Sequence, residues 1–156
     1  MKFQIRPCTD HDFEAVFRLL GQLWPDRELD RHALPKIFQR ALCSAAQVYL
    51  CGEVADKVVG FVSLSIKNSL WQAANLGYID ELIVDEKHRE CSFGTQLLNE
   101  IIAHARRRGC KRVDLIRRST GKRHMNFTDD VDSKTAPICS RNPYASMIGR
   151  RVQSGK

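Results

Sequence analysis

The chain has 156 residues and a net charge of +7, and 43% of its residues are hydrophobic while 28% are charged. This length fits one domain, and the composition is typical of a soluble globular protein rather than of a disordered or fibrous one. No apolar run approaches the roughly 20 residues needed to span a bilayer, and the N-terminus lacks the apolar core of a signal peptide, so we expect a cytoplasmic protein without membrane association.

In chain order, the first half of the sequence alternates short strands and helices. Hydrophobic spacing predicts a strand over 3–6, a helix that begins after Thr9 or Asp10 and ends at Trp24, a helix over 34–42 and a strand over 47–51. A turn-like stretch over 52–57 followed by an apolar run over 58–67 predicts a hairpin.

The second half shows the clearest periodicity. A polar loop is expected over 68–76, a central strand over 78–84, an amphipathic helix over 93–105 that Gly109 caps, and a strand over 111–116. The expected order is therefore β-α-α-β-β-β-α-β, which is typical of an α/β fold.

Six cysteines stand at positions 8, 43, 51, 91, 110 and 139, and no Cys-x-x-Cys pair occurs. We therefore expect no zinc site or other metal site, and we interpret the cysteines as free thiols or small core residues.

The positive charge lies mainly at the C-terminal end. Residues 116–156 contain nine Lys and Arg against three Asp and Glu, a net +6, whereas residues 1–115 carry +1. Charge confined to a tail does not make the whole domain a nucleic-acid binder. Nucleic acid is therefore not the expected partner, although binding through the basic tail remains an alternative that steep salt dependence would reveal.

The segment from Val84 to Leu98 joins the expected central strand to the following helix through a short polar turn. This arrangement presents backbone N–H groups of a helix N-terminus to a phosphate. Arg89-x-x-Ser92-x-Gly94 resembles the pyrophosphate loop of the GNAT family of N-acetyltransferases, whose pattern is Arg or Gln, two residues, Gly, one residue, Gly or Ala. Ser92 stands where the first Gly of that pattern belongs.

The resemblance covers about residues 1–115 and implies the acyl-CoA N-acyltransferase (GNAT) fold, an α/β fold with a mixed, mostly antiparallel central sheet flanked by helices. It implies transfer of acetyl from acetyl-CoA to a primary amine, with a small molecule as the expected acceptor. The residues that it implies for acetyl-CoA binding are Leu82, Ile83, Val84, Arg89, Glu90, Cys91, Ser92, Phe93, Gly94 and Thr95. Among these, Ile83 and Val84 would bond the pantetheine arm through their main chain.

Glu81 is the candidate catalytic residue, because many relatives carry a carboxylate on this strand that accepts the amine proton. A partly buried Glu has a raised pKa and is a better base at neutral pH. The structural alternative, a salt bridge made by Glu81, stays open. Asp80 is expected on the opposite face of the strand, and no Tyr stands in the Phe-Tyr motif that supplies the general acid in the family.

Residues 116–156 form an atypical basic tail in place of the last helix and hairpin of the family. If the reading frame moves back by one nucleotide after Leu115, the codons of residues 116–128 can spell D-S-A-F-H-R-K-E-A-H-E-F-Y, which is similar to the missing family segment. We therefore hypothesise that the tail is translated out of frame. Without the family segment, the strand over 111–116 would be an exposed edge, and we expect either a catalytically impaired relative or completion by a second chain, as in a homodimer.

Overall fold

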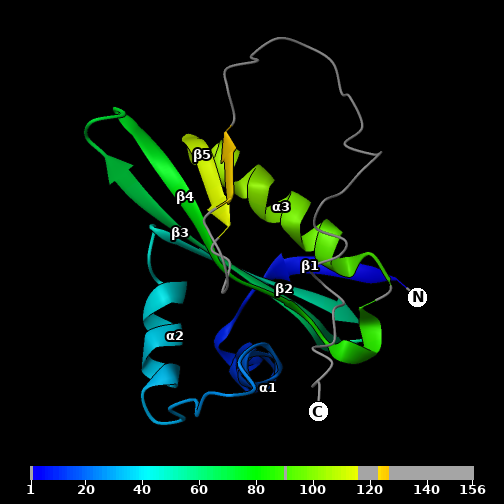
Figure 1. The fold of residues 1–156 in the computed structure, drawn as a ribbon. Helices are drawn as coiled ribbons and strands as arrows, with labels where there is room; N and C mark the ends of the chain where they lie inside the picture. The colour runs from blue at the N-terminus through cyan, green and yellow to red at the C-terminus, as the bar shows by residue number, and fades with distance from the viewer. Residues whose placement is uncertain (1, 90, 116–122, 127–156) are drawn as a thin grey trace, which may run out of the picture.

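The computed structural model describes residues 2–89, 91–115 and 123–126, which build a six-stranded sheet and its flanking helices (Figure 1). The strands lie side by side in chain order: β1 (Phe3–Pro7), β2 (Gln47–Val54), β3 (Lys57–Ser69), β4 (Ala74–Val84), β5 (Cys110–Leu115) and β6 (Arg123–Asn126). Neighbouring strands are antiparallel except for the parallel pair of β4 and β5. The expected α/β fold with a mixed, mostly antiparallel sheet is confirmed.

Helices cover both faces of the sheet. The helix α3 (Phe93–Arg107) lies on one face, while α1 (Phe13–Leu23) and α2 (Leu34–Leu42) lie on the other (Figure 1). Two short 3-10 helices precede α1 and α3, namely η1 (Asp10–Asp12) and η2 (Glu86–His88). Among the described residues, no helix is long and apolar enough to cross a membrane.

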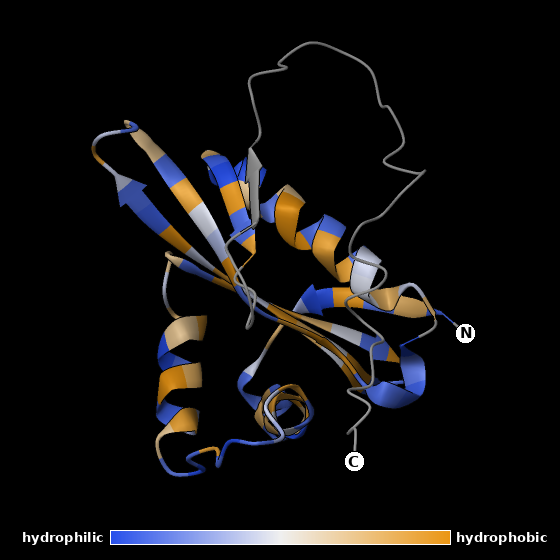
Figure 2. Ribbon diagram, in the orientation of Figure 1, coloured by the Kyte–Doolittle hydropathy of each residue, from blue (hydrophilic) through white to orange (hydrophobic). Residues whose placement is uncertain are grey.

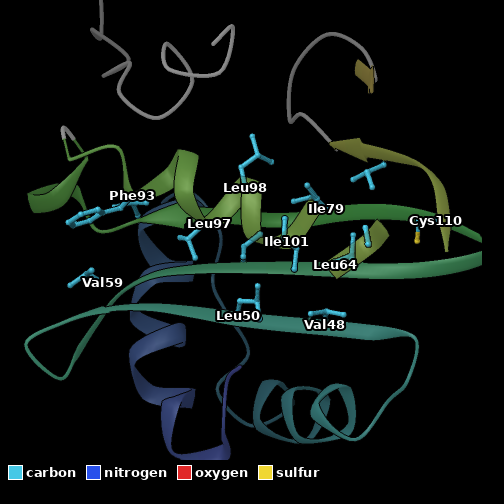
Figure 3. Packing of buried hydrophobic residues seen from close by; sticks show 14 of the residues in the cluster. Val48, Leu50, Val59, Leu64, Ile79, Phe93, Leu97, Leu98, Ile101 and Cys110 are labelled. Atoms are coloured by element: carbon cyan, nitrogen blue, oxygen red, sulfur yellow. The ribbon is translucent and has the colours of Figure 1, made fainter. Parts of the chain in front are cut away.

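The larger core lies between α3 and the sheet. Leu97 and Ile101 of α3 are fully buried and belong to the same cluster as Leu64 and Ile79 of β3 and β4 (Figure 3). The strands in the middle of the sheet carry many hydrophobic residues, coloured orange in Figure 2. Full burial of one such side chain stabilises the fold by about 1.5–3 kcal/mol, so this cluster holds the start of α3 firmly against β4.

The second core lies beneath α1 and α2. Val16 and Leu19 of α1 are buried together with Phe38 of α2 and Phe61 of β3. Tyr49 of β2 packs between the two aromatic rings, with centroids 5.6 Å from Phe38 and 5.4 Å from Phe61. These contacts fix the face of β2, β3 and β4 that α1 and α2 cover.

The two hairpins are tighter than the sequence predicts. The turn between β2 and β3 consists of Ala55 and Asp56, whose φ angles of 48° and 60° match a two-residue turn of the type that follows strand twist. The predicted turn over 52–57 was therefore too long. The predicted loop over 68–76 was also too long, because β3 runs to Ser69 and β4 starts at Ala74. In both hairpins, pairing with the neighbouring strand extends the strands into polar residues that the sequence pattern assigns to the turn.

Gly109 ends α3 with a φ of 71°, a left-handed conformation that glycine adopts without strain, as its predicted capping role requires.

The strand β6 departs from expectation. β6 pairs antiparallel with β5, with Val113 opposite Met125, so β5 is not the exposed edge that we expected. The rest of the basic tail, 116–122 and 127–156, lies outside the described residues. That part of the tail includes Thr128, at which the hypothesis of out-of-frame translation places the family's Tyr.

Candidate active site

β4 extends beyond the part of it that pairs with the described residues of β5. The parallel pairing ends with Ile79 opposite Leu115, whereas β4 continues to Val84. On its other edge, β4 stays paired with β3 through Ile83 opposite Phe61 and Val84 opposite Gly60. Within the described part of the chain, no strand lies on the β5 side of residues 80–84. Among the described strands, residues 80–84 of β4 therefore pair with β3 alone.

An irregularity in β4 places two carboxylates on one face. Ser63 lies opposite Glu81 and Leu64 lies opposite Ile79, so Asp80 is an extra residue in β4, a β-bulge. Asp80 interacts with Ser65 and lies near Lys67, which share the face of Ser63 on β3. The expectation that Asp80 points to the opposite face was wrong, because the bulge breaks the two-residue alternation on which it depended.

Glu81 is held in a half-buried position by Ser63. The Ser63 hydroxyl donates to Glu81 Oε2 and accepts from the Glu81 amide N at 3.0 Å. Burial raises the pKa of the Glu81 carboxyl, the hydrogen bond from Ser63 lowers it, and the charge of Asp80 raises it further, with a net increase. Glu81 forms no salt bridge among the described residues, so the structural alternative finds no support there.

Tyr49 completes a row across three strands that sequence reasoning missed. Tyr49 on β2 lies opposite Ser63 on β3, which lies opposite Glu81 on β4. Burial, followed by the charges of Glu81 and Asp80, raises the pKa of Tyr49 to about 12. Register alone brings these residues together, and a single sequence carries no signal that pairs residue 49 with residue 81.

The turn after β4 is anchored by Asp85, which is buried. Its amide N donates to the Val59 carbonyl at 2.7 Å, and its Oδ1 accepts from the Lys87 amide N at 3.1 Å. The guanidinium of Arg18 on α1 donates to Asp85 Oδ2, and burial opposes these bonds, yet the pKa of Asp85 is lowered overall. An ionised Asp85 therefore fixes the path of the chain into the loop before α3.

The loop itself turns on Ser92, the first residue before α3. Ser92 has a φ of 59° and a ψ of 11°, the left-handed conformation that favours glycine, at the position where the resemblance places a Gly. The first hydrogen bond of the helix runs from the Gln96 amide N to the Ser92 carbonyl at 3.2 Å. The amides of Phe93 and Gly94 therefore precede the regular bonds of α3 and lie at its positive end.

Side chains around the loop are placed as follows. Arg89 Nε donates to the Val84 carbonyl at 3.3 Å, and the Phe93 ring stacks on Phe3 of β1 with centroids 4.1 Å apart. Cys91 is exposed, and Glu90 lies outside the described residues. His88 Nδ1 is buried and has no hydrogen-bond partner in the described part of the chain. A helix N-terminus, a left-handed turn and an unpartnered imidazole nitrogen together fit a diphosphate.

The structure thus brings the sequence-predicted residues onto one continuous stretch. Glu81 and the segment 82–84 lie on the half of β4 beyond its described pairing with β5, and the described residues of the loop 89–95 follow that strand. Ile83, Val84, Phe93 and Gly94 are buried, whereas Leu82, Arg89 and Thr95 are half-buried and Ser92 is exposed. A half-buried carboxylate on β4, followed by a left-handed turn at a helix N-terminus, is the arrangement expected of an acyl-CoA-dependent N-acyltransferase.

Comparison with known proteins agrees with this class. The model of the acetyltransferase (GNAT) family matches residues 13–128. Glucosamine 6-phosphate N-acetyltransferase of Trypanosoma brucei brucei is 25% identical over 114 residues, which cover 72% of this chain and 78% of that protein.

Solved structures show the same fold. Glucosamine-6-phosphate N-acetyltransferase from Arabidopsis thaliana superimposes with a TM-score of 0.66 at 20% identity, covering 100% of this chain and 98% of that one. An aminoglycoside 6'-N-acetyltransferase from Acinetobacter baumannii gives a TM-score of 0.65 at 16% identity, covering 74% of this chain and 80% of that one.

The chain belongs to the acetyltransferase (GNAT) family. It is accordingly an acetyl-CoA-dependent N-acetyltransferase, and acetyl-CoA is its acetyl donor.

Proposed function

We propose that this enzyme acetylates a primary amine of a small molecule and that Glu81 is its general base. The observation that carries this proposal is the position of Glu81, which is half-buried, hydrogen-bonded to Ser63 and placed two residues beyond the last described pairing of β4 with β5. By the resemblance, the thioester of acetyl-CoA lies beside this part of β4.

The chemistry needs a base at this place. An alkyl amine has a pKa of roughly 10, so it is protonated at neutral pH and must lose a proton before it attacks. Glu81 accepts that proton, directly or through water, and its raised pKa makes it a better base than an exposed carboxylate. The neutral nitrogen then attacks the thioester carbonyl, and backbone N–H groups of β4 stabilise the oxyanion.

Tyr49 acts as a hydrogen-bonding residue rather than as the acid that protonates the leaving thiolate. Its pKa of about 12 lies far above that of a thiol, roughly 8.5, so proton transfer from Tyr49 to a thiolate is unfavourable. A neutral hydroxyl in the row with Ser63 and Glu81 suits an acceptor that carries hydroxyl or amine groups.

We assign the donor, acetyl-CoA, to the part of the chain that follows Glu81, namely the end of β4 and the loop before α3. The main chain of 82–84 binds the pantetheine arm, and the loop of Arg89, Glu90, Cys91, Ser92, Phe93, Gly94 and Thr95 binds the diphosphate. The left-handed Ser92 and the amides at the start of α3 support this assignment. Positioning donor and acceptor on one strand makes the reaction effectively intramolecular.

The acceptor side is negative, which favours a cationic amine. Asp80 and Glu81 share one face through the bulge, and Lys67 is the cation whose charge acts on Asp80. The relatives include enzymes named for an amino sugar phosphate and for aminoglycosides. We therefore infer an amino sugar or a comparable small amine as the acceptor class, and the expected homodimer remains a prediction.

The test is a transfer assay with acetyl-CoA and a panel of amines that contains amino sugars, amino sugar phosphates, aminoglycosides, polyamines and a lysine peptide. Acetylated products are detected by mass, since exposed cysteines would react with a thiol reagent. Turnover of one small-amine class that Glu81→Gln lowers by roughly 10²-fold or more supports the proposal. Turnover of the peptide alone, or full activity of Glu81→Gln, contradicts it.

A further inference from the structure

Two cysteines that the proposed reaction does not use lie in contact beneath α1. Cys8 follows the end of β1, and Cys51 lies on β2, 43 residues later in the chain. Their Sγ atoms are 2.6 Å apart. Both side chains are buried, with 8% and 0% of their surface exposed, and both are thiols in the structure.

The fold brings the two thiols together by backbone pairing. Arg6 lies opposite Cys51 and Pro7 lies opposite Leu50, and the Cys8 amide N then donates to the Tyr49 carbonyl at 2.9 Å. Hydrogen bonding therefore holds the Cys8 backbone against β2 one residue beyond the strand. Both side chains belong to the buried cluster under α1, so they face the same layer.

A metal site does not account for this pair. Asp12 is the third potential ligand, and the three ligand atoms lie within 4.8 Å of one another. Both Asp12 oxygens already accept from Arg6, at 2.7 and 2.8 Å, and Oδ2 also accepts from the Thr9 amide N at 2.7 Å. Two thiolates on one zinc ion, each about 2.3 Å from it in tetrahedral geometry, would stand roughly 3.8 Å apart, well beyond the observed contact.

We propose that Cys8 and Cys51 form an intramolecular disulfide when the chain folds in the presence of a small-molecule disulfide. One cysteine thiolate attacks oxidised glutathione, giving a mixed disulfide and one glutathione thiol. The second cysteine then attacks the mixed disulfide and releases the second glutathione. The protein loses two electrons and two protons, and both protons end on the two glutathione thiols.

Burial decides when this exchange takes place. The hydrogen bond with Cys51 and burial raise the pKa of the Cys8 thiol, so the folded pair holds little of the thiolate that exchange requires. The exchange therefore occurs while the chain folds, before α1 covers the pair. Once formed, the bond is shielded from reductants by the same layer, and it ties the entry of α1 to β2.

The measurement compares protein refolded with a reduced and oxidised glutathione mixture and protein refolded with a phosphine reductant. After unfolding and alkylation, the first sample should show four modified cysteines of the six and the second should show all six. Peptide mass mapping should join the Cys8 peptide to the Cys51 peptide. The midpoint of thermal unfolding should be higher in the oxidised sample by roughly 5–15 °C.

Matched variants separate this bond from other oxidation. Cys43→Ser removes an exposed cysteine and should keep the thermal shift, whereas Cys8→Ala should lose it. Six alkylated cysteines in both samples, a cross-link between other positions or an unchanged midpoint overturns the proposal. Mass mapping on the unmutated chain decides the matter even if Cys8→Ala folds poorly.

Discussion

Ser63 lies directly opposite Glu81, and its hydroxyl donates to the Glu81 carboxylate while accepting from the Glu81 amide N at 3.0 Å. One hydroxyl therefore fixes both the backbone and the side chain of the residue that we propose as the base. Because the bulge at Asp80 lies next to Glu81, the same stretch also sets the charge around it.

This pairing predicts a pH dependence. Burial and the charge of Asp80 raise the pKa of Glu81. The pH profile of kcat/KM should therefore have a rising limb whose midpoint lies above the ordinary pKa of a glutamate. Glu81→Gln should remove that limb and lower kcat by roughly 10²–10⁴-fold. Asp80→Asn is the matched variant: removing a like charge lowers the pKa of Glu81, so the limb should move to lower pH. A limb that stays in place in Asp80→Asn would contradict the coupling.

The left-handed Ser92 predicts a gain from glycine. A non-glycine residue in this conformation costs roughly 1 kcal/mol, so Ser92→Gly should raise stability by about that amount and tighten coenzyme A binding by up to roughly fivefold. Calorimetry with coenzyme A and thermal unfolding measure the two effects. Ser92→Ala keeps the strain and removes the hydroxyl. Weaker binding by Ser92→Ala together with no gain in Ser92→Gly would show that the hydroxyl, not the backbone, decides affinity.

A side chain at Gly52 would disturb the support of the loop. An added Cβ would lie 2.2 Å from Phe3 Cζ, and the Phe3 ring stacks on Phe93 at the start of α3. Gly52→Ala should therefore destabilise the fold by about 1–3 kcal/mol in denaturant unfolding. Gly21→Ala is the control, because nothing lies within 4 Å of its Cβ position in α1 and the helix should gain about 0.5–1 kcal/mol. Equal effects of the two changes would refute this explanation.

The ion pair before α1 predicts acid sensitivity. Arg6 lowers the pKa of Asp12 from 3.8 to about 2, helped by hydrogen bonds from Thr9. A lowered carboxyl pKa stabilises the fold above pH 3.8, and that contribution is lost as pH falls through about 2. Because Arg6 is partly exposed, the contribution is about 1–2 kcal/mol. In Asp12→Asn, unfolding followed from pH 5 to 2 should show lower stability at pH 5 and a flatter pH profile. A profile as steep as that of the parent would exclude Asp12 as the titrating group.

The reading frame of the tail gives a prediction at the level of DNA. If the tail is out of frame, the codons after Leu115 should spell the Ala-His-x-Phe-Tyr motif in the neighbouring frame. Met125 followed by Asn126 forces Glu there, and Asn126 followed by Phe127 forces Phe or Leu. The Tyr that serves as general acid in the family would fall at the codon that here reads Thr128. Sequencing the coding DNA across codon 115 checks this, and codons that cannot spell the motif would end the hypothesis.

Much of the fold could be predicted because its signals are local. The helix at 34–42 has the predicted bounds, and the start of α3 at Phe93 and its cap at Gly109 follow from apolar spacing and glycine. The ends of the hairpins were wrong because pairing with a neighbouring strand extends each strand beyond its apolar run. β6 was missed for a similar reason, since its four residues carry no periodicity and are strand only through pairing with β5.

By itself, the sequence determined the order of the elements from β1 to β5 and predicted the loop at Arg89, Ser92 and Gly94, because helical spacing, capping and turn chemistry are set by residues a few positions apart. Tertiary structure alone decided that Asp80 and Glu81 share a face, that Tyr49 joins their row and that Cys8 meets Cys51. These relationships depend on a bulge and on strand register. The bulge and the register depend on how the whole sheet packs between two layers of helices. No short stretch of sequence encodes that packing.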